Sequence, residues 1–461
     1  MSLRKYIVYK DSGVEWIGQI PSHWKIDRIK ASILSSRNGI WGDEPQGDES
    51  DIACVRVADF DRNKLQVKPQ IPTIRSVTEK ERNGRVLHRG DLLLEKSGGG
   101  ELQPVGQVVM YQLDMPAVCS NFVARVVLKP GMNPGYWNYV HNAAYSVGVN
   151  LGSINQTSGI QNLDQDRYFN ESAPFPPEPE QFEIATFLDR ETAKIDTLIA
   201  EQEKLIALLA LKRQATISHA VTKGLNPNAP MKDSGVAWLG PVPAHWEVAA
   251  LKRYWSVTDC KHITAEFVDD GYPLASIREV QSRFISLDAA KRTTHQFYEQ
   301  LIEGDRKPLP GDLIFSRNAT VGEVAQVNEL HPAFAMGQDV CLLRRLCEDW
   351  SSDFMQAVIR SNIVVEQLKN IIVGSTFKRV NVEEIRNLQV PAPPPDEQAK
   401  IAVFIINETN RLDLLKVAAE RAVHLLNERR STLITAAVTG QIDVRSVISP
   451  AITESLEALA A

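Results

Sequence analysis

The stretch KDSGVEWIGQIPSHW at residues 10–24 decides how this chain is organised, because it returns as KDSGVAWLGPVPAHW at residues 232–246. Both copies follow the pattern W-x-G-x-x-P-x-H-W, so they share two tryptophans, a glycine, a proline and a histidine in the same frame. Chance does not produce such a match. The chain therefore contains an internal duplication.

A second duplicated block follows each cassette. APFPPEPEQFEIATFLDRETAKIDTL begins at Ala173, and VPAPPPDEQAKIAVFIINETNRLDLL begins at Val390, 217 residues later. Prolines and acidic residues open each block, where they suit the first turn of a helix. Beyond these prolines, no proline or glycine interrupts the pattern before Gly224 or Gly440. Each block is predicted to be one long helix.

Apolar residues recur along both blocks at steps of three and four, which is typical of a coiled coil. A helix of roughly 45 residues would be about 65 Å long and would extend beyond a single domain, which favours pairing of the two helices over two separate amphipathic helices. A pseudo-twofold relation between the repeats makes the pair antiparallel. The predicted seam is Ile184, Leu188, Ile195, Leu198, Leu205 and Leu209 in the first copy, and Ile401, Ile405, Leu412, Leu415, Ala422 and Leu426 in the second.

Two larger segments, about 31–160 and 253–375, lie between cassette and helix. Strand-like runs dominate both, with helical stretches between them. Their clearest shared feature is Gly90-Asp91-Leu92 against Gly311-Asp312-Leu313, each leading through a strand into a polar loop. The two segments differ from each other far more than the cassettes and helices do.

These patterns predict an α+β (mixed α/β) fold with two globular domains separated by two long antiparallel coiled-coil-like helices in a pseudo-twofold internal repeat. The predicted boundaries are 1–172 for the first globular domain, 173–225 for the central helix, 226–389 for the second globular domain, and 390–461 for the C-terminal helix and tail.

Composition sets wider limits. The chain has 461 residues, 43% of them hydrophobic, and a formal net charge of −6. No apolar run approaches the roughly 18 residues that span a bilayer, and the N-terminal stretch has no apolar core, so we expect a cytoplasmic protein without membrane contact. The five cysteines are scattered and form no CxxC pair, so neither a disulfide framework nor a zinc site is expected. The net negative charge argues against a free-standing DNA-coating protein but allows local basic surfaces.

The duplicated motifs resemble those of the specificity (S) subunit of type I restriction-modification systems, over nearly the whole chain. The resemblance rests on the order of these motifs in one chain: W-x-G-x-x-P-x-H-W twice, Gly-Asp-Leu with its polar loop twice, P-P-x-x-E-Q before each helix, SGIQNL at 158–163 and GSTFKRVN at 374–381.

The resemblance implies that each variable segment is a target recognition domain for one half of a bipartite site in double-stranded DNA. It implies that the helices set the gap between the half-sites. Two methyltransferase (M) subunits would dock on the helical frame, and restriction/translocase (R) subunits would join them. S-adenosylmethionine, ATP and Mg are expected on those partners, with no cofactor in this chain. Because the two segments diverge, we predict an asymmetric target.

The sequence lacks the signatures of the catalytic alternatives. The sequence has no GxxxxGK[ST] phosphate loop and no Asn/Asp-Pro-Pro-aromatic loop of an adenine methyltransferase. The acidic residues of PDEQAK at 395–400 fall in one helical turn without a separated partner. His23 and His245 each precede a tryptophan, but no cysteine, serine or carboxylate partner is duplicated with them. We interpret them as structural and predict a chain that is not an enzyme by itself and holds no metal.

Sequence discrimination needs side chains on base edges, whereas phosphate contacts only position the protein. The candidates lie in polar loops: Lys96, Ser97, Gln103, Gln161 and Asn162 in the first segment, and Arg278, Arg283, Arg317, Asn318, Thr320, Lys378 and Arg379 in the second. Arginine pairs bidentately with guanine, and asparagine or glutamine with adenine. The Gln161-Asn162 and Lys378-Arg379 stretches recur in the family's frame, which favours phosphate contact or a structural role there.

Two other functions compete with DNA reading. A non-DNA scaffold would hold two copies of a partner protein through duplicated binding domains, and the net acidity favours it slightly. A solitary modification enzyme would need the cofactor motifs that the sequence lacks. The loops bearing arginine and asparagine, together with the resemblance, favour a sequence-specific DNA-binding subunit.

Overall fold

The computed structural model describes residues 4–100, 102–157, 159–372 and 379–445. The chain forms two compact units. Unit 1 consists of Met1–Glu201 and Arg421–Ala461, and unit 2 of Gln202–Glu420. Each unit contains one cassette, one variable segment and half of each long helix.

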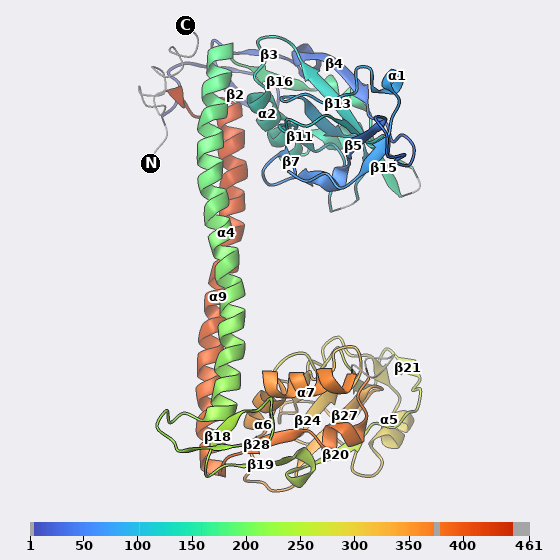
Figure 1. The fold of residues 1–461 in the computed structure, drawn as a ribbon, viewed down its shortest axis with the longest axis vertical. Helices are drawn as coiled ribbons and strands as arrows, with labels where there is room; N and C mark the ends of the chain where they lie inside the picture. Colours follow the sequence, from blue (N-terminus) through green and yellow to red (C-terminus); the bar gives the residue numbers. More distant parts are fainter. Residues whose placement is uncertain (1–3, 101, 158, 373–378, 446–461) are drawn as a thin grey trace. The chain divides into compact units, whose positions relative to one another are not determined.

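Unit 1 contains a six-stranded mixed sheet and a smaller three-stranded sheet (Figure 1). The strands of the larger sheet are, in order, β4 (Ile33–Asn38), β13 (Val123–Leu128), β9 (Leu92–Glu95), β11 (Val108–Met110), β7 (Gln66–Val67) and β6 (Phe60–Asp61). Those of the smaller sheet are β12 (Ala117–Cys119), β5 (Asp51–Val55) and β8 (Ile74–Ser76). Every residue of β9 is buried, so the centre of the larger sheet is covered on both faces. Helix α2 (Pro134–Ser146) contributes Tyr136 and Trp137 to this core.

Unit 2 contains two four-stranded sheets. The first has the order β20 (Trp255–Asp259), β27 (Val340–Arg345), β24 (Leu313–Ser316) and β25 (Val324–Gln326). The second has the order β21 (Phe267–Val268), β23 (Arg292–Thr293), β22 (Tyr272–Ala275) and β26 (Ala335–Met336). The accompanying helices are α5 (His295–Ile302), α6 (Ser352–Ile359), α7 (Asn362–Ile372) and α8 (Val382–Arg386).

The central strands of the two units have the same order and register. The strands β4-β13-β9-β11 of unit 1 correspond to β20-β27-β24-β25 of unit 2. Val123 pairs with Glu95 in unit 1, and Val340, 217 residues after Val123, pairs with Ser316 in unit 2. The duplication therefore extends through the variable segments, beyond the similarity that the sequence shows.

The two Gly-Asp-Leu triplets have a structural role. Both glycines adopt a left-handed backbone, with φ of 93° and 90°, which favours glycine. Both aspartates are buried. The carboxylate of Asp91 accepts a hydrogen bond from Nε of Arg125 at 2.6 Å, and that of Asp312 accepts one from Arg344 at 2.7 Å. Each triplet thus fixes the turn that precedes the central strand.

The long helices begin later than predicted. Helix α4 spans Glu178–Lys223 and α9 spans Pro395–Val438. The expected first residues of the helical blocks instead form β16 (Ser172–Phe175), which pairs with β3 (Lys25–Arg28), and β28 (Gln389–Ala392), which pairs with β19 (Glu247–Ala250). The physical reason is that each proline keeps the residue before it extended.

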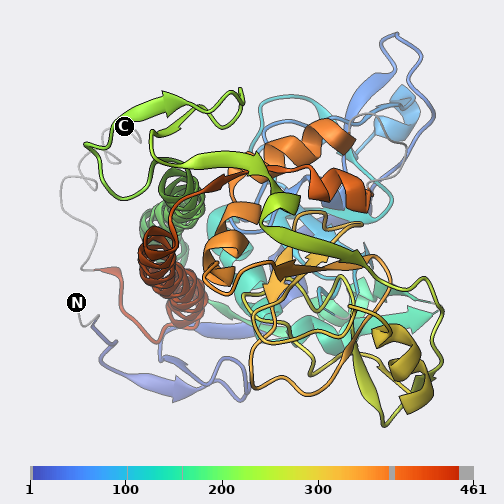
Figure 2. The ribbon, with the colours of Figure 1, turned by 90° about the horizontal axis from the view of Figure 1, so that it is seen from below.

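The antiparallel pairing of α4 and α9 is confirmed within each unit. Figures 1 and 2 show the two helices side by side. In unit 1 Asp196 lies 3.0 Å from Nε of Arg430, and in unit 2 Asp413 lies 3.4 Å from Nε of Arg213. These are the same residues of the repeat, 217 positions apart, so the helices make one ion pair twice in opposite directions.

The predicted seam is partly confirmed. Ile184, Leu188, Ile195 and Leu209 are buried in α4, as are Ile401, Ile405 and Leu412 in α9. Leu198, Leu205 and Leu415 were wrongly placed in the seam, because they are 50%, 41% and 49% exposed. Supercoiled contact leaves only a narrow stripe covered, and these leucines lie outside it.

Each cassette begins with a short antiparallel pair of strands, β1 (Tyr9–Asp11) with β2 (Gln19–Pro21) and β17 (Met231–Asp233) with β18 (Pro241–Pro243). Short helices α1 (Glu79–Arg82) and α3 (Gln165–Phe169) complete the helices of unit 1. Among the described residues, no helix has both the length and the apolar character needed to cross a membrane.

Candidate nucleic-acid interface

In unit 1 the structure brings two of the predicted polar stretches together in one ribbon. Strand β10 (Ser97–Gly98) pairs with β15 (Ile160–Leu163), which pairs with β14 (Ile154–Thr157). Ser97 lies opposite Asn162, and its hydroxyl donates a hydrogen bond to Oδ1 of Asn162 at 2.7 Å. Two candidates far apart in the sequence therefore form one polar surface directly after the buried central strand β9.

The other candidates of unit 1 differ in exposure. Gln161 is buried, and its Oε1 accepts a hydrogen bond from the backbone N–H of Val105 at 3.2 Å, so this side chain stabilises the ribbon. Lys96 is half-buried, whereas Gln103 and Asn162 are exposed. Lys96, Gln103 and Asn162 can therefore offer polar groups to a ligand.

Unit 2 repeats the ribbon contact with other residues. An antiparallel bridge joins Asn318 to Arg379, and Arg379 is the residue 217 positions after Asn162. The guanidinium of Arg379 lies 3.6 Å from Oδ1 of Asp339, and its side chain is 41% exposed. Thr320 is half-buried, with Oγ1 3.0 Å from Oγ of Ser316. Lys378 lies outside the described residues.

Arg317 is not exposed, as a residue that contacts bases directly would need to be. It is buried, its Nε donates a hydrogen bond to the carbonyl of Val380 at 3.1 Å, and its Nη1 forms an ion pair with Asp259. A buried guanidinium needs such partners. Arg317 thus positions the loop, and a direct contact with a base would require the ion pair to open.

Neither of the other two candidate arginines of unit 2, Arg278 and Arg283, takes part in the bridge between Asn318 and Arg379. Arg278 is exposed. Arg283 forms an ion pair with Asp353 at 2.9 Å and lies with Arg213 and Arg360 in the wall of a cavity of about 310 Å³. Residues of α4 and α9 line the same cavity. Arg283 is therefore placed against the helices of its unit, and its contact with DNA stays a prediction.

Several acidic residues near the candidate positions were missed in the sequence. Glu95, the last residue of β9, is 1% exposed and forms a 2.9 Å ion pair with Arg62. Burial raises the pKa of the Glu95 carboxyl, although Arg62 opposes this shift. Asp259 and Asp339 were missed in the same way. A charged residue directly after the apolar run Leu92–Leu94 was the one available signal for Glu95.

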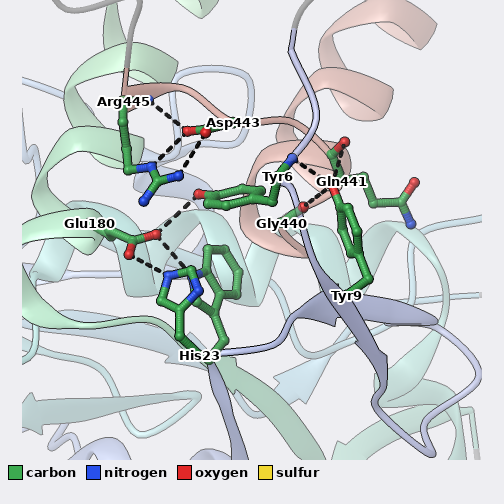
Figure 3. Close-up of polar contacts among 9 residues, drawn as sticks. Tyr6, Tyr9, His23, Glu180, Gly440, Gln441, Asp443 and Arg445 are labelled. Carbon is green, nitrogen blue, oxygen red and sulfur yellow. Dashed lines mark hydrogen bonds and ion pairs between the residues drawn. The ribbon is translucent and has the colours of Figure 1, made fainter.

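The cassette histidine and tryptophan of unit 1 contact one carboxylate of α4, and Figure 3 shows His23 beside Glu180. Nε2 of His23 lies 2.6 Å from Oε1 of Glu180, and Nε1 of Trp24 donates a hydrogen bond to Oε2 at 3.0 Å. Tyr6 donates a third hydrogen bond to Glu180 at 3.1 Å, and Arg445 lies over the Tyr6 ring. Burial beside Glu180 raises the pKa of Tyr6 above its usual range.

Unit 2 makes the same contact. His245 lies 2.8 Å and Trp246 lies 3.0 Å from Oε2 of Glu397. The expectation that no carboxylate partner is duplicated with the histidines is therefore wrong, because Glu180 and Glu397 are that partner. Trp24 and Trp246 are completely buried. The structural interpretation of the histidines agrees with these contacts, since each group joins a cassette to a helix; we call it the cassette clamp.

One group of three potential metal ligands occurs among the described residues. Ligand atoms of Asp259, Cys260 and His262 lie within 4.8 Å of one another. Asp259 already pairs with the buried Arg317, whose positive charge would repel a cation at this place. We therefore assign no metal to this group.

The fold and the two equivalent polar contacts define a class of protein with two diverged units, each of which includes part of two antiparallel helices. Comparison with known proteins shows which family the chain resembles. Residues 264–421 match the family described as type I restriction modification DNA specificity domain. Over 448 residues the chain is 21% identical to the putative type I restriction enzyme MjaX specificity subunit of Methanocaldococcus jannaschii. The alignment covers 93% of this chain and 96% of that protein.

Two solved structures share the fold. A chain from work on complex assembly and conformational transition of the type I R-M system has a TM-score of 0.68 at 15% identity, covering 91% of this chain and 98% of that chain. The HsdS subunit from Thermoanaerobacter tengcongensis has a TM-score of 0.52 at 14% identity, covering 92% and 98%. These similarities confirm the resemblance of the chain to the specificity subunits of type I restriction-modification systems.

Proposed function

We propose that this chain is the sequence-specific DNA-binding subunit of a type I restriction-modification complex and that each unit reads one half of an asymmetric bipartite target. The observation that carries the proposal is a pair of equivalent strand contacts with different side chains, one in each unit. Ser97 meets Asn162 in unit 1, and Asn318 meets Arg379 in unit 2.

The chemistry of these residues supports different half-sites. Asparagine forms a bidentate pair with adenine, and arginine forms one with guanine. Asn162 and Arg379 are equivalent residues of the repeat and make equivalent backbone contacts, with Ser97 and Asn318 respectively. Their side chains therefore favour different bases. An asymmetric target follows from this difference.

The partners are proposed from the surface of the helices. Leu198 and Leu425 of unit 1 are 50% and 53% exposed, and Leu415 and Leu208 of unit 2, their counterparts in the repeat, are 49% and 52% exposed. A duplicated pair of exposed leucines supports docking of two copies of one partner, here the methyltransferase subunit. Restriction subunits join this assembly, and S-adenosylmethionine, ATP and Mg are bound by the partners, while this chain is non-catalytic.

An exchange of segment 253–380 with that of a relative tests the assignment of one unit to one half-site. The methylated motif of cells that carry the exchanged chain should change in one half and keep the other. A change in both halves would refute the assignment, and a symmetric motif of the natural chain would refute the asymmetric target.

A DNA-binding measurement distinguishes the proposed function from the alternative, a scaffold that does not bind DNA. The chain with its methyltransferase partner should shift duplex DNA, with an affinity that falls steeply as salt rises because lysine and arginine displace counterions from phosphates. A partner complex that forms normally but leaves duplex DNA unshifted at low salt would favour the scaffold.

A further inference from the structure

Phe122 of unit 1 is tied to the strand that enters the ribbon. It lies in the turn between β12 and β13, and its carbonyl oxygen accepts hydrogen bonds from the N–H groups of Lys96 at 2.9 Å and Ser97 at 3.3 Å. Its side chain is 46% exposed. The structure therefore holds a large apolar ring at the surface, next to residues proposed to read DNA.

The equivalent position of unit 2 has a different side chain on the same backbone contact. Asp339, 217 residues after Phe122, accepts a hydrogen bond from the N–H of Arg317 at 2.8 Å, and Arg317 occupies the place of Lys96. The Asp339 carboxylate lies 3.6 Å from Arg379. One backbone position thus presents an aromatic ring in one unit and an anchor for an arginine in the other.

The chemistry of the ring limits what it can contact. A single exposed apolar residue is ordinary on a protein surface, but Phe122 is fixed beside Ser97, at a position where the two units diverge. A phenyl ring has no hydrogen-bonding group. In the major groove its apolar partner is the C5 methyl group of thymine.

Resting on the proposed function, we propose that Phe122 is a specificity-determining residue of unit 1 that contacts the C5 methyl of a thymine in the half-site read by that unit. In unit 2 the equivalent Asp339 instead orients Arg379. Thymine contact at this position is therefore a property of one half-site alone.

The first test compares Phe122→Ala with Phe182→Ala, a control on α4 of the same unit with a similarly exposed ring of 41%. Each full chain is assembled with its methyltransferase partner. Phe122→Ala should bind the cognate duplex about tenfold more weakly, as expected for loss of one base contact of about 1.4 kcal/mol. It should also relax the methylated motif at one position of one half. Wild-type binding and motif in Phe122→Ala would overturn the proposal.

A second test needs no variant. Each thymine of the cognate site is replaced in turn by deoxyuridine, which lacks only the methyl group. One replacement, in the half-site of unit 1, should weaken binding by the wild-type chain about fourfold, the loss expected for one buried methyl of about 0.8 kcal/mol. The same replacement should leave binding by Phe122→Ala unchanged. If no replacement in that half weakened wild-type binding, the thymine contact would be refuted, even if Phe122→Ala disturbed the turn.

These outcomes separate the inference from the function on which it rests. If the wild-type complex fails to shift duplex DNA at all, the proposed function fails. If it binds the cognate site and tolerates both the Phe122 substitution and every deoxyuridine, only the role of Phe122 fails.

Discussion

Lys96 in unit 1 and Arg317 in unit 2 follow equivalent strands and donate their backbone N–H groups to equivalent carbonyls. Their side chains nevertheless have opposite environments. Lys96 is half-buried and faces the surface, whereas Arg317 is buried against Asp259. Unit 1 places its buried ion pair one residue earlier, between Glu95 and Arg62. The two units therefore share the same backbone contacts and strand register. They differ in which position of the repeat holds the buried charge.

The cassette clamp shows the contrary behaviour. Histidine, tryptophan and glutamate keep the same partners in both units. Contacts that join each unit to the helices are thus repeated, and contacts at the ribbon diverge. This division is what a protein needs when one frame must present two different reading surfaces.

The largest difference in stability between the two units is expected when the equivalent residues Lys96 and Arg317 are substituted in turn. Arg317→Ala should destabilise unit 2 by roughly 3 kcal/mol, because it removes the buried guanidinium that donates both to Asp259 and to the carbonyl of Val380. Lys96→Ala should change stability by less than about 0.5 kcal/mol and should lower the salt dependence of DNA binding by about one phosphate contact. Hydrogen exchange of residues 313–345 and 92–128 measures the two units separately. Equal losses of protection would contradict the different roles.

The clamp should respond in both units, with a larger response in unit 1. Glu180→Ala should destabilise unit 1 by roughly 3 kcal/mol, and Glu397→Ala should destabilise unit 2 by roughly 2 kcal/mol. The difference arises because Glu180 also accepts a hydrogen bond from Tyr6, and each such bond to a carboxylate contributes about 1 kcal/mol or more. Tyr6→Phe should remove most of the difference. Hydrogen exchange of the two cassettes measures it, and a larger effect at Glu397 would contradict the contacts described.

The exposed leucines should give equal effects in the two units. Leu198→Ser with Leu425→Ser should weaken one methyltransferase contact by roughly 2 kcal/mol, since each half-exposed leucine retains about half of its burial energy for a partner. Leu208→Ser with Leu415→Ser should weaken the other contact equally. Mass measurement of the complex should find one partner copy lost in each case. Leu330→Ser, at an exposed loop residue of unit 2, is the control; two retained copies in both double variants would refute the docking surface.

The smallest effect is a difference in pH response. Burial raises the pKa of Glu95, so its contribution to the stability of unit 1 is greatest below the carboxyl's unfolded pKa and declines as pH rises through the folded pKa. The equivalent residue of unit 2, Ser316, does not titrate in this range. Glu95→Gln should therefore gain stability relative to wild type as pH rises from acidic to neutral. Hydrogen exchange of residues 92–128 at two pH values checks this, and the opposite trend would contradict it.

Much of the fold was predictable because it depends on local pattern. The duplicated cassettes, the long helices and the two diverged segments all followed from spacing and periodicity. The exact helix starts did not follow, because Pro174 and Pro391 lie in strands that pair with β3 and β19. The seam was drawn too wide at Leu198, Leu205 and Leu415, since periodicity does not show how much of a stripe the partner covers.

The loops that form the candidate interface could be predicted from the sequence, but the roles of their individual residues could not. Ser97 and Asn162 were both chosen from the sequence, but only the strand register shows that they face each other. Arg317 was chosen for its type, and its burial depends on Asp259, a residue remote in sequence. Phe122 carried no local signal, because its exposure is decided by the turn that ties it to Lys96.

The sequence by itself determined that this protein has two related units, a repeated helical frame and a resemblance to the specificity subunits, because repeats, periodicity and motif order are local properties of the chain. Only the tertiary structure decided which polar residues are exposed and which form buried ion pairs or hydrogen bonds. That outcome depends on partners far apart in sequence and on strand register, where a slip of one residue would turn each side chain to the other face.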